Sequence, residues 1–210
     1  MGRYLDSSCK LCRREGMKLM LKGTRCETAK CPIEKKRRNV APGMHGWRRS
    51  RLSEHGVRLR EKQKVKRYYG LLNKQFMHYF RSAERAKGNT GEVLLELLER
   101  RLDNVVYKLN FAPSRKSARQ IISHGHIYVN GHKVNVPDYT VKVGDTITIK
   151  NSEKSSKVVK EQLESNPNFT TQSWLQLDRS KPSAMVVALP SRDDVQIPVE
   201  EQLIVEFCSR

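Results

Sequence analysis

Four cysteines near the start of the chain carry the most specific chemistry in the sequence. Cys9, Cys12, Cys26 and Cys31 follow the spacing C-x2-C-x13-C-x4-C. Two close pairs of thiolates can surround one tetrahedral cation, and four soft ligands favour Zn2+. Because protein would fill all four coordination positions, we expect a structural zinc site and not a catalytic one.

Two alternatives concern the same four cysteines. An iron–sulfur cluster uses the same number of thiolates, so the spacing alone does not separate it from zinc. Free cysteines or disulfides fit less well, because a segment this short and polar offers little core in which to bury thiols. We expect the basic residues between the ligands, Lys10, Arg13, Arg14 and Arg25, to keep the thiolates deprotonated.

No other group of residues indicates catalysis. A zinc deaminase would need a His or Cys, a nearby Glu and a Pro-Cys-x-x-Cys pair, whereas Ser8 precedes the first cysteine pair. The chain has neither a phosphate-binding glycine-rich loop nor a nucleophile elbow. We therefore expect no enzymatic activity and no small-molecule substrate.

Positive charge dominates the first third of the chain. The 210 residues carry 41 Lys and Arg against 22 Asp and Glu, a formal net charge of +19. Residues 1–67 contribute a net +15, whereas residues 151–210 contribute −2. Such an excess is typical of a protein whose partner is rich in phosphates. The longest apolar run, Ala184–Leu189, is too short for a membrane helix, and the N-terminus lacks a secretion signal, so we expect a soluble cytoplasmic protein.

The densest basic run surrounds a helix predicted from Glu54 to Tyr69, with Ser53 as its N-cap. A solvated face with so few acidic residues would repel itself, so we expect contact with RNA phosphates. The residues assigned to this contact are Arg48, Arg49, Arg51, Arg58, Arg60, Lys62, Lys64, Lys66, Arg67 and Tyr68, together with Arg3 near the N-terminus.

A second RNA-facing surface is predicted on a short helix between Ser114 and Gly125. Its basic residues lie on one side, while the apolar residues at 118, 121 and 122 face a core. A hydroxyl and free N–H groups at the helix N-terminus also favour phosphate. The alternative is a merely amphipathic helix without a ligand. The residues assigned to RNA contact are Ser114, Arg115, Lys116, Arg119 and His124.

Hydrophobic periodicity predicts helices followed by strands. Further helices are expected from Asn73 toward Gly88 and, without interruption, over Gly91–Leu109. After His126 the period changes to two, and Asn130-Gly131 and Gly144-Asp145 mark the turns of two hairpins. We expect a polar helix and loop over residues 151–172, then short strands and turns to the C-terminus.

Several motifs resemble a family of ribosomal proteins. Residues 101–107 (RLDNVVY), 114–120 (SRKSARQ) and 124–131 (HGHIYVNG) are similar to the small RNA-binding domain named after small-subunit ribosomal protein four. Pseudouridine synthases and tyrosyl-tRNA synthetases also carry that domain, so it leaves the function open. The flanking motifs APGMHG (41–46), LREKQK (59–64) and PVEEQLIVEF (198–207) resemble the ribosomal protein four family itself, of bacterial type, in its metal-binding four-cysteine branch.

The resemblance implies an α+β fold in four parts. A metal-binding N-terminal segment (1–45) precedes a basic helical domain (46–98). A small α/β RNA-binding domain with β-hairpins (99–165) is inserted next, and a C-terminal segment (166–210) packs back on the helical domain. The alternatives are an RNA-modifying enzyme or synthetase fragment, which needs a catalytic domain that the chain lacks, and an RNA chaperone, which would lack the cysteine segment.

The implied function is that of a structural constituent of the small ribosomal subunit. Family members bind a multi-helix junction of small-subunit ribosomal RNA (rRNA) early in assembly, contact neighbouring ribosomal protein five and influence translational accuracy. Arg48, Arg49 and Arg51 match the family position that lines the path by which messenger RNA (mRNA) enters the ribosome. The alternative for these three arginines is that they clamp the rRNA junction like their neighbours.

Overall fold

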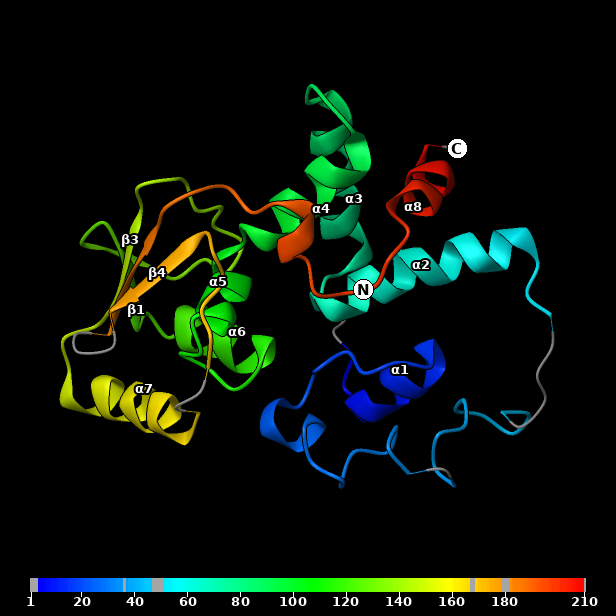
Figure 1. Cartoon of the computed structure of the whole chain (residues 1–210), viewed down its shortest axis with the longest axis horizontal. Helices are drawn as coiled ribbons and strands as arrows, with labels where there is room; N and C mark the ends of the chain where they lie inside the picture. Colours follow the sequence, from blue (N-terminus) through cyan, green and yellow to red (C-terminus); the bar gives the residue numbers. More distant parts are fainter. Residues whose placement is uncertain (1–3, 36, 47–50, 167–168, 179–181, 210) are drawn as a thin grey trace. The chain divides into compact units, whose positions relative to one another are not determined.

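The computed structural model describes residues 4–35, 37–46, 51–166, 169–178 and 182–209. The chain forms two compact units. Unit 1 comprises Met1–Leu94 and Ile197–Arg210, and unit 2 comprises Leu95–Gln196. The chain therefore leaves unit 1, forms unit 2 and returns to unit 1 (Figure 1). Within the described ranges, no helix is both long and apolar enough to cross a membrane.

Unit 1 is helical. Helix α2 begins where the sequence predicts, because the Ser53 hydroxyl accepts a hydrogen bond from the N–H of Gly56. The last helix, α8, packs along α2 (Figure 1). The elements of unit 1 are α1 (Ser8–Glu15), the 3-10 helix η1 (Gly23–Cys26), α2 (Glu54–Tyr68), α3 (Asn73–Arg85), the first half of α4 (Thr90–Glu99) and α8 (Glu201–Cys208).

Unit 2 combines helices with a five-stranded antiparallel sheet of order β2-β1-β3-β5-β4. A helical unit followed by a small sheet confirms the expected α+β class. After the second half of α4, the elements are α5 (Leu102–Lys108), α6 (Arg115–Ser123), β1 (Ile127–Val129), β2 (His132–Val134), β3 (Thr146–Ile149), α7 (Glu153–Ser165), β4 (Leu175–Asp178), β5 (Ser183–Val186) and the 3-10 helix η2 (Arg192–Asp194).

One face of the sheet packs against helices of unit 2. Strand residues Ile127, Ile147 and Val186 belong to the same buried core as Val106 of α5 and Ile122 of α6. Alternation along each strand puts the other residues, such as the exposed Thr146 and Met185, on the opposite face. Removal of this apolar surface from water is the main force that holds unit 2 together.

The first predicted hairpin is confirmed. Ile127 pairs with Val134, and Val129 pairs with His132, around the turn Asn130-Gly131. Both turn residues have positive φ, 51° at Asn130 and 79° at Gly131. A type I′ turn requires this conformation at both positions, and Asn and Gly adopt it at the lowest cost.

The continuous helix predicted over Gly91–Leu109 is wrong, because the chain breaks between α4 and α5. Arg101 is extended (φ −65°, ψ 135°) and forms an isolated β-bridge with Thr140. The side-chain amide of Asn104 donates to the last carbonyl of α4, at Glu99, at 3.0 Å. Polar side chains thus stabilise the break, although the apolar residues on both sides keep helical spacing.

The second predicted hairpin is also wrong in part. Strand β3 pairs with β1 and β5, and Val141 and Val143 lie outside any strand. The tail differs from the prediction as well: β4 and β5 extend the sheet of unit 2, and only Ile197–Arg210 belong to unit 1. Strand β5 occupies the edge of β3 with which Val141 and Val143 were expected to pair, and β4 pairs with β5 on its other edge.

Candidate nucleic-acid interface

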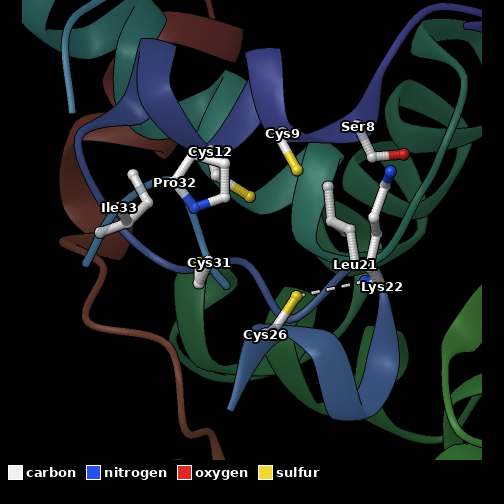
Figure 2. Close-up of a pocket in the computed structure, with 9 residues that line it drawn as sticks. All are labelled: Ser8, Cys9, Cys12, Leu21, Lys22, Cys26, Cys31, Pro32 and Ile33. Carbon is white, nitrogen blue, oxygen red and sulfur yellow. Dashed lines mark hydrogen bonds between the residues drawn. The ribbon is translucent and has the colours of Figure 1, made fainter. Parts of the chain in front are cut away.

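The four predicted metal ligands line one small pocket in unit 1 (Figure 2). Cys9 and Cys12 come from α1, Cys26 ends η1, and Cys31 lies in the turns that follow. All four are free thiols. Among the described residues, no three ligating side chains stand close enough together to form a ready-made metal site. The structure therefore brings the two cysteine pairs to one place without completing a coordination sphere.

Burial governs the acidity of these thiols. It raises the pKa of Cys12 and of Cys26, and the neighbouring thiols raise both further. Backbone groups oppose the shift, because the N–H of Lys22 donates to Cys26 Sγ at 3.4 Å (Figure 2). Burial therefore disfavours the thiolate form of Cys12 and Cys26, and a bound cation would favour it.

The basic residues of α1 that were expected to keep the thiolates deprotonated have other hydrogen-bond and ion-pair partners. Arg13 Nη1 donates to the carbonyl of Val40 at 3.2 Å, and Arg14 Nη2 donates to the carbonyl of Pro42 at 2.7 Å. Lys10 pairs with Asp6 one turn earlier. The two arginines instead fasten the loop at residues 40–42 to α1.

A buried carboxylate attaches α1 to the basic helix α2. Glu15, at the end of α1, is only 1% exposed and forms ion pairs with Arg60, at 3.3 Å, and with Arg67. Burial raises the pKa of Glu15, and the two guanidinium groups oppose this shift without cancelling it. Two of the cations predicted to bind RNA therefore hold the cysteine segment on the helical part of unit 1.

We expect replacement Glu15→Lys to detach the cysteine segment from α2 and to destabilise unit 1 by about 3 kcal/mol or more, because it buries an ammonium group beside two guanidinium groups. The control Glu15→Gln should cost less, because it adds no buried positive charge and its partners Arg60 and Arg67 are 28% and 21% exposed, so water can reach them. Limited proteolysis within residues 4–46 and thermal unfolding measure both effects. Equal stability of the two variants would show that Glu15 does not hold the segment.

The other cations of α2 are also engaged within unit 1. Arg58 Nε donates to Glu206 of α8 at 2.7 Å. The ammonium group of Lys62 is buried 4.9 Å from the ring centroid of Phe207. Lys64 pairs with Glu61, and burial lowers the pKa of Lys66. Helix α2 thus uses much of its charge to hold α1 and α8, a role that its sequence does not reveal.

The remaining residues of the first predicted surface have three different outcomes. Tyr68 is buried against Tyr69, with ring centroids 5.0 Å apart, and so packs in the core of unit 1. Arg51 is exposed just before α2. Arg3, Arg48 and Arg49 lie outside the described residues.

On α6, Ser114 caps the helix as predicted, but Arg115 does not face solvent. The Ser114 hydroxyl accepts a hydrogen bond from the N–H of Ser117 at 3.3 Å. Arg115 is 5% exposed, donates to Asn104 Oδ1 at 2.8 Å and lies 4.4 Å over the ring of Tyr107. The predicted position of Arg115 on the side of the helix away from the core is therefore wrong, because this arginine is buried and ties α6 to α5.

Arg119 is held by a buried acidic residue. Its Nε donates to Asp103 Oδ2 at 3.0 Å, and Asp103 also forms a two-bond pair with Arg101, at 2.9 and 3.1 Å. Arg101 is in turn paired with Asp138. These four residues, the Asp103 network, join α5, α6 and the loop before Val141, so Arg119 also has a structural role that the sequence analysis missed.

Exposed groups suited to RNA lie in the first turn of α6 and just after its last residue. Lys116 and His124 are exposed, as predicted for residues that contact a ligand. Sequence reasoning missed Lys133, which lies across Gly125: a Cβ built on that glycine would stand 2.1 Å from Lys133 Cε. The predicted hairpin could have indicated this lysine, because a two-residue turn at Asn130-Gly131 pairs Lys133 with Tyr128.

Comparison with known proteins matches both parts of the chain. Residues 3–99 match the family described as Ribosomal protein S4/S9 N-terminal domain, and residues 100–147 match the S4 domain. Over the whole of both chains, the sequence is 56% identical to small ribosomal subunit protein uS4 of Halothermothrix orenii. It is 53% identical to the uS4 protein of Pelotomaculum thermopropionicum and 52% identical to that of Thermoanaerobacter sp. strain X514, again over full length.

A basic helical unit, an S4 domain and full-length similarity to small-subunit proteins define the class: a structural, RNA-binding ribosomal protein and not an enzyme. The match outside the S4 domain removes the alternatives of an RNA-modifying enzyme, a synthetase fragment or a small RNA chaperone. The chain belongs to the uS4 family, of bacterial type, and binds ribosomal RNA as part of the small subunit.

Proposed function

We propose that the chain is a primary assembly protein that recognises a multi-helix junction of small-subunit rRNA. The observation that carries this proposal is the distribution of charge: unit 1 and α6 present exposed cations, whereas residues 151–210 have a net charge of −2. A junction offers phosphates from several helices at once, which suits a chain that folds into two compact units.

We expect binding to this rRNA to weaken steeply with salt, because each neutralised phosphate releases counterions. About eight contacts would give a slope near −6 to −7 in a plot of log affinity against log salt concentration. Filter binding with rRNA transcribed in vitro measures the slope, and crosslinking in cells identifies the RNA. A flat salt response, or crosslinks mainly to transfer RNA, would contradict the proposal.

A structural Zn2+ at Cys9, Cys12, Cys26 and Cys31 forms part of the proposal. Its support is the convergence of four thiols on one pocket, together with the backbone N–H that Lys22 directs at Cys26 Sγ. Groups of this kind commonly orient and stabilise metal-bound thiolates. When bound, the metal would supply the positive charge that these buried thiols lack and would cross-link α1 to the turns around Cys31.

The proposal also includes contacts with ribosomal protein five and with mRNA, and a role in translational accuracy. Arg51 is exposed and lies in a stretch with few apolar anchors, which suits contact with a moving strand through phosphates alone. We expect the triple replacement of Arg48, Arg49 and Arg51 by Ala to leave subunit assembly near normal while slowing translation through structured mRNA. Failure of the variant to enter small subunits would instead assign the arginines to the rRNA junction.

A further inference from the structure

Helix α3 has one buried side and one basic side. Phe76, Tyr79, Phe80 and Ala83 are buried at helical spacing. The opposite side carries Lys74, His78, Arg81 and Arg85, four residues spaced by four, three and four positions, and all four are exposed. This second set, the α3 stripe, therefore runs along the helix as one continuous row.

The cations of the α3 stripe are not used to hold the fold. On α2, carboxylates from α1 and α8 neutralise Arg60, Arg67 and Arg58. No ion pair formed between described residues includes Lys74, Arg81 or Arg85. The acidic residue of α3, Glu84, lies next to this row and leaves it with a net positive charge. Unit 1 thus presents unneutralised charge on α3, where the sequence analysis expected it on α2.

We propose that the α3 stripe binds the phosphate backbone of rRNA; the inference rests on the proposed function and adds a contact surface to it. From Lys74 to Arg85 the row extends over about 16 Å, long enough to follow several successive phosphates. Arginine presents a planar fork that matches phosphate oxygens, and two of the three cations are arginines. His78 lies between Lys74 and Arg81 and offers an aromatic face to an unstacked base.

RNA fits the stripe better than an acidic protein surface does. The row has hydrogen-bond donors and one imidazole ring but no exposed large apolar side chain, whereas protein interfaces usually need a desolvated apolar centre. A polar, cationic row that keeps its side chains hydrated is suited to phosphates, which are bound through charge and counterion release.

The test compares two full-length variants that each lose two positive charges. The stripe variant is Arg81→Gln with Arg85→Gln, and the control is Lys157→Gln with Lys160→Gln, two exposed lysines of α7, a helix that also carries three glutamates. The probe is full-length small-subunit rRNA transcribed in vitro, with large-subunit rRNA as competitor. All four positions are exposed, so both variants should keep the Tm of the wild type, and a third variant, Arg81→Lys with Arg85→Lys, keeps the charge.

We expect the stripe variant to bind about tenfold more weakly near physiological salt and to lose about two from the slope of log affinity against log salt. The control and the Lys variant should stay close to the wild type. Acetylation of Lys74, followed by mass spectrometry, should be slower in the complex than in the free protein, while Lys157 reacts equally in both.

Each contrary result has one meaning. If wild-type protein does not prefer small-subunit rRNA over the competitor, the proposed function fails. If the wild type shows the preference but the stripe variant binds like the control and Lys74 is not protected, the inference alone is overturned. If the stripe variant binds RNA normally but enters subunits poorly, the stripe contacts a protein partner, and the inference that it binds rRNA is also overturned.

Discussion

Replacing Asp103 by Asn is expected to lower the free energy of unfolding of unit 2 by about 3–5 kcal/mol, because the change removes one partner of a buried ion pair. Asp103 and Arg101 are each 2% exposed, so the guanidinium group that loses its carboxylate has little access to water. Arg119 loses the same acceptor, which frees one of the ties that hold α6. Denaturant unfolding measures the loss.

Asp138 provides the matched control, since it binds the same arginine from the surface. Its side chain is 39% exposed, so water can replace it, and we expect Asp138→Asn to cost at most about 1 kcal/mol. Binding of rRNA should fall in the Asp103 variant because α6 is no longer held, although Asp103 itself carries the same sign of charge as RNA. Equal stability of the two variants would show that the Asp103 network does not support unit 2.

Signals that act over a few residues predicted local structure well. The caps at Ser53 and Ser114 start α2 and α6, and Asn130-Gly131 closes the first hairpin. Each of these depends on a hydrogen bond or a dihedral angle within the same turn, so the residue types are sufficient to predict it.

Structure that depends on distant partners was not predictable in this way. The break after α4 is stabilised by Arg101, whose partners include Asp138, 37 residues away. Strand β5, which pairs with β3, comes after α7 in the chain. The residues near Val141 and Val143 therefore do not show that these two valines are left out of the sheet. The apolar periodicity would be the same with or without the break after α4, and with or without Val141 and Val143 in the sheet. Contacts with residues far along the chain decide between these structures, and a local pattern does not encode them.

The sequence also did not show which charges of the candidate site are free to bind a ligand. A count of lysines and arginines identified α2 as basic, but it did not show that Glu206, 148 residues from Arg58, uses one of those charges. The cations of α3 are fewer and more widely spaced, and they remain exposed. Availability of a charge depends on the tertiary partner, so sequence density alone overestimated the number of unpaired charges on α2 and did not indicate the exposed row on α3.

Removal of the proposed metal should unfold only the N-terminal cysteine segment, from Met1 to about His45. Its thiols line their own pocket, and the core of unit 2 around Val106 contains no cysteine ligand. Binding of a structural Zn2+ typically contributes about 10–16 kcal/mol in small zinc modules, so a segment with so little core of its own should not stay folded without it. Binding of rRNA should survive in part.

Hydrogen exchange before and after treatment with a chelator measures this directly, because amides of α1 and η1 should lose protection while those of α5 and α6 keep theirs. Elemental analysis separates the two metals: one zinc in a colourless protein supports the proposal, whereas a brown protein with about four irons would replace zinc by an iron–sulfur cluster. Cys26→Ser should abolish the metal content, and Cys208→Ser, outside the pocket, should leave it unchanged. Full protection of α1 after the metal has been removed would mean that Glu15 and its two arginines hold the segment without a metal.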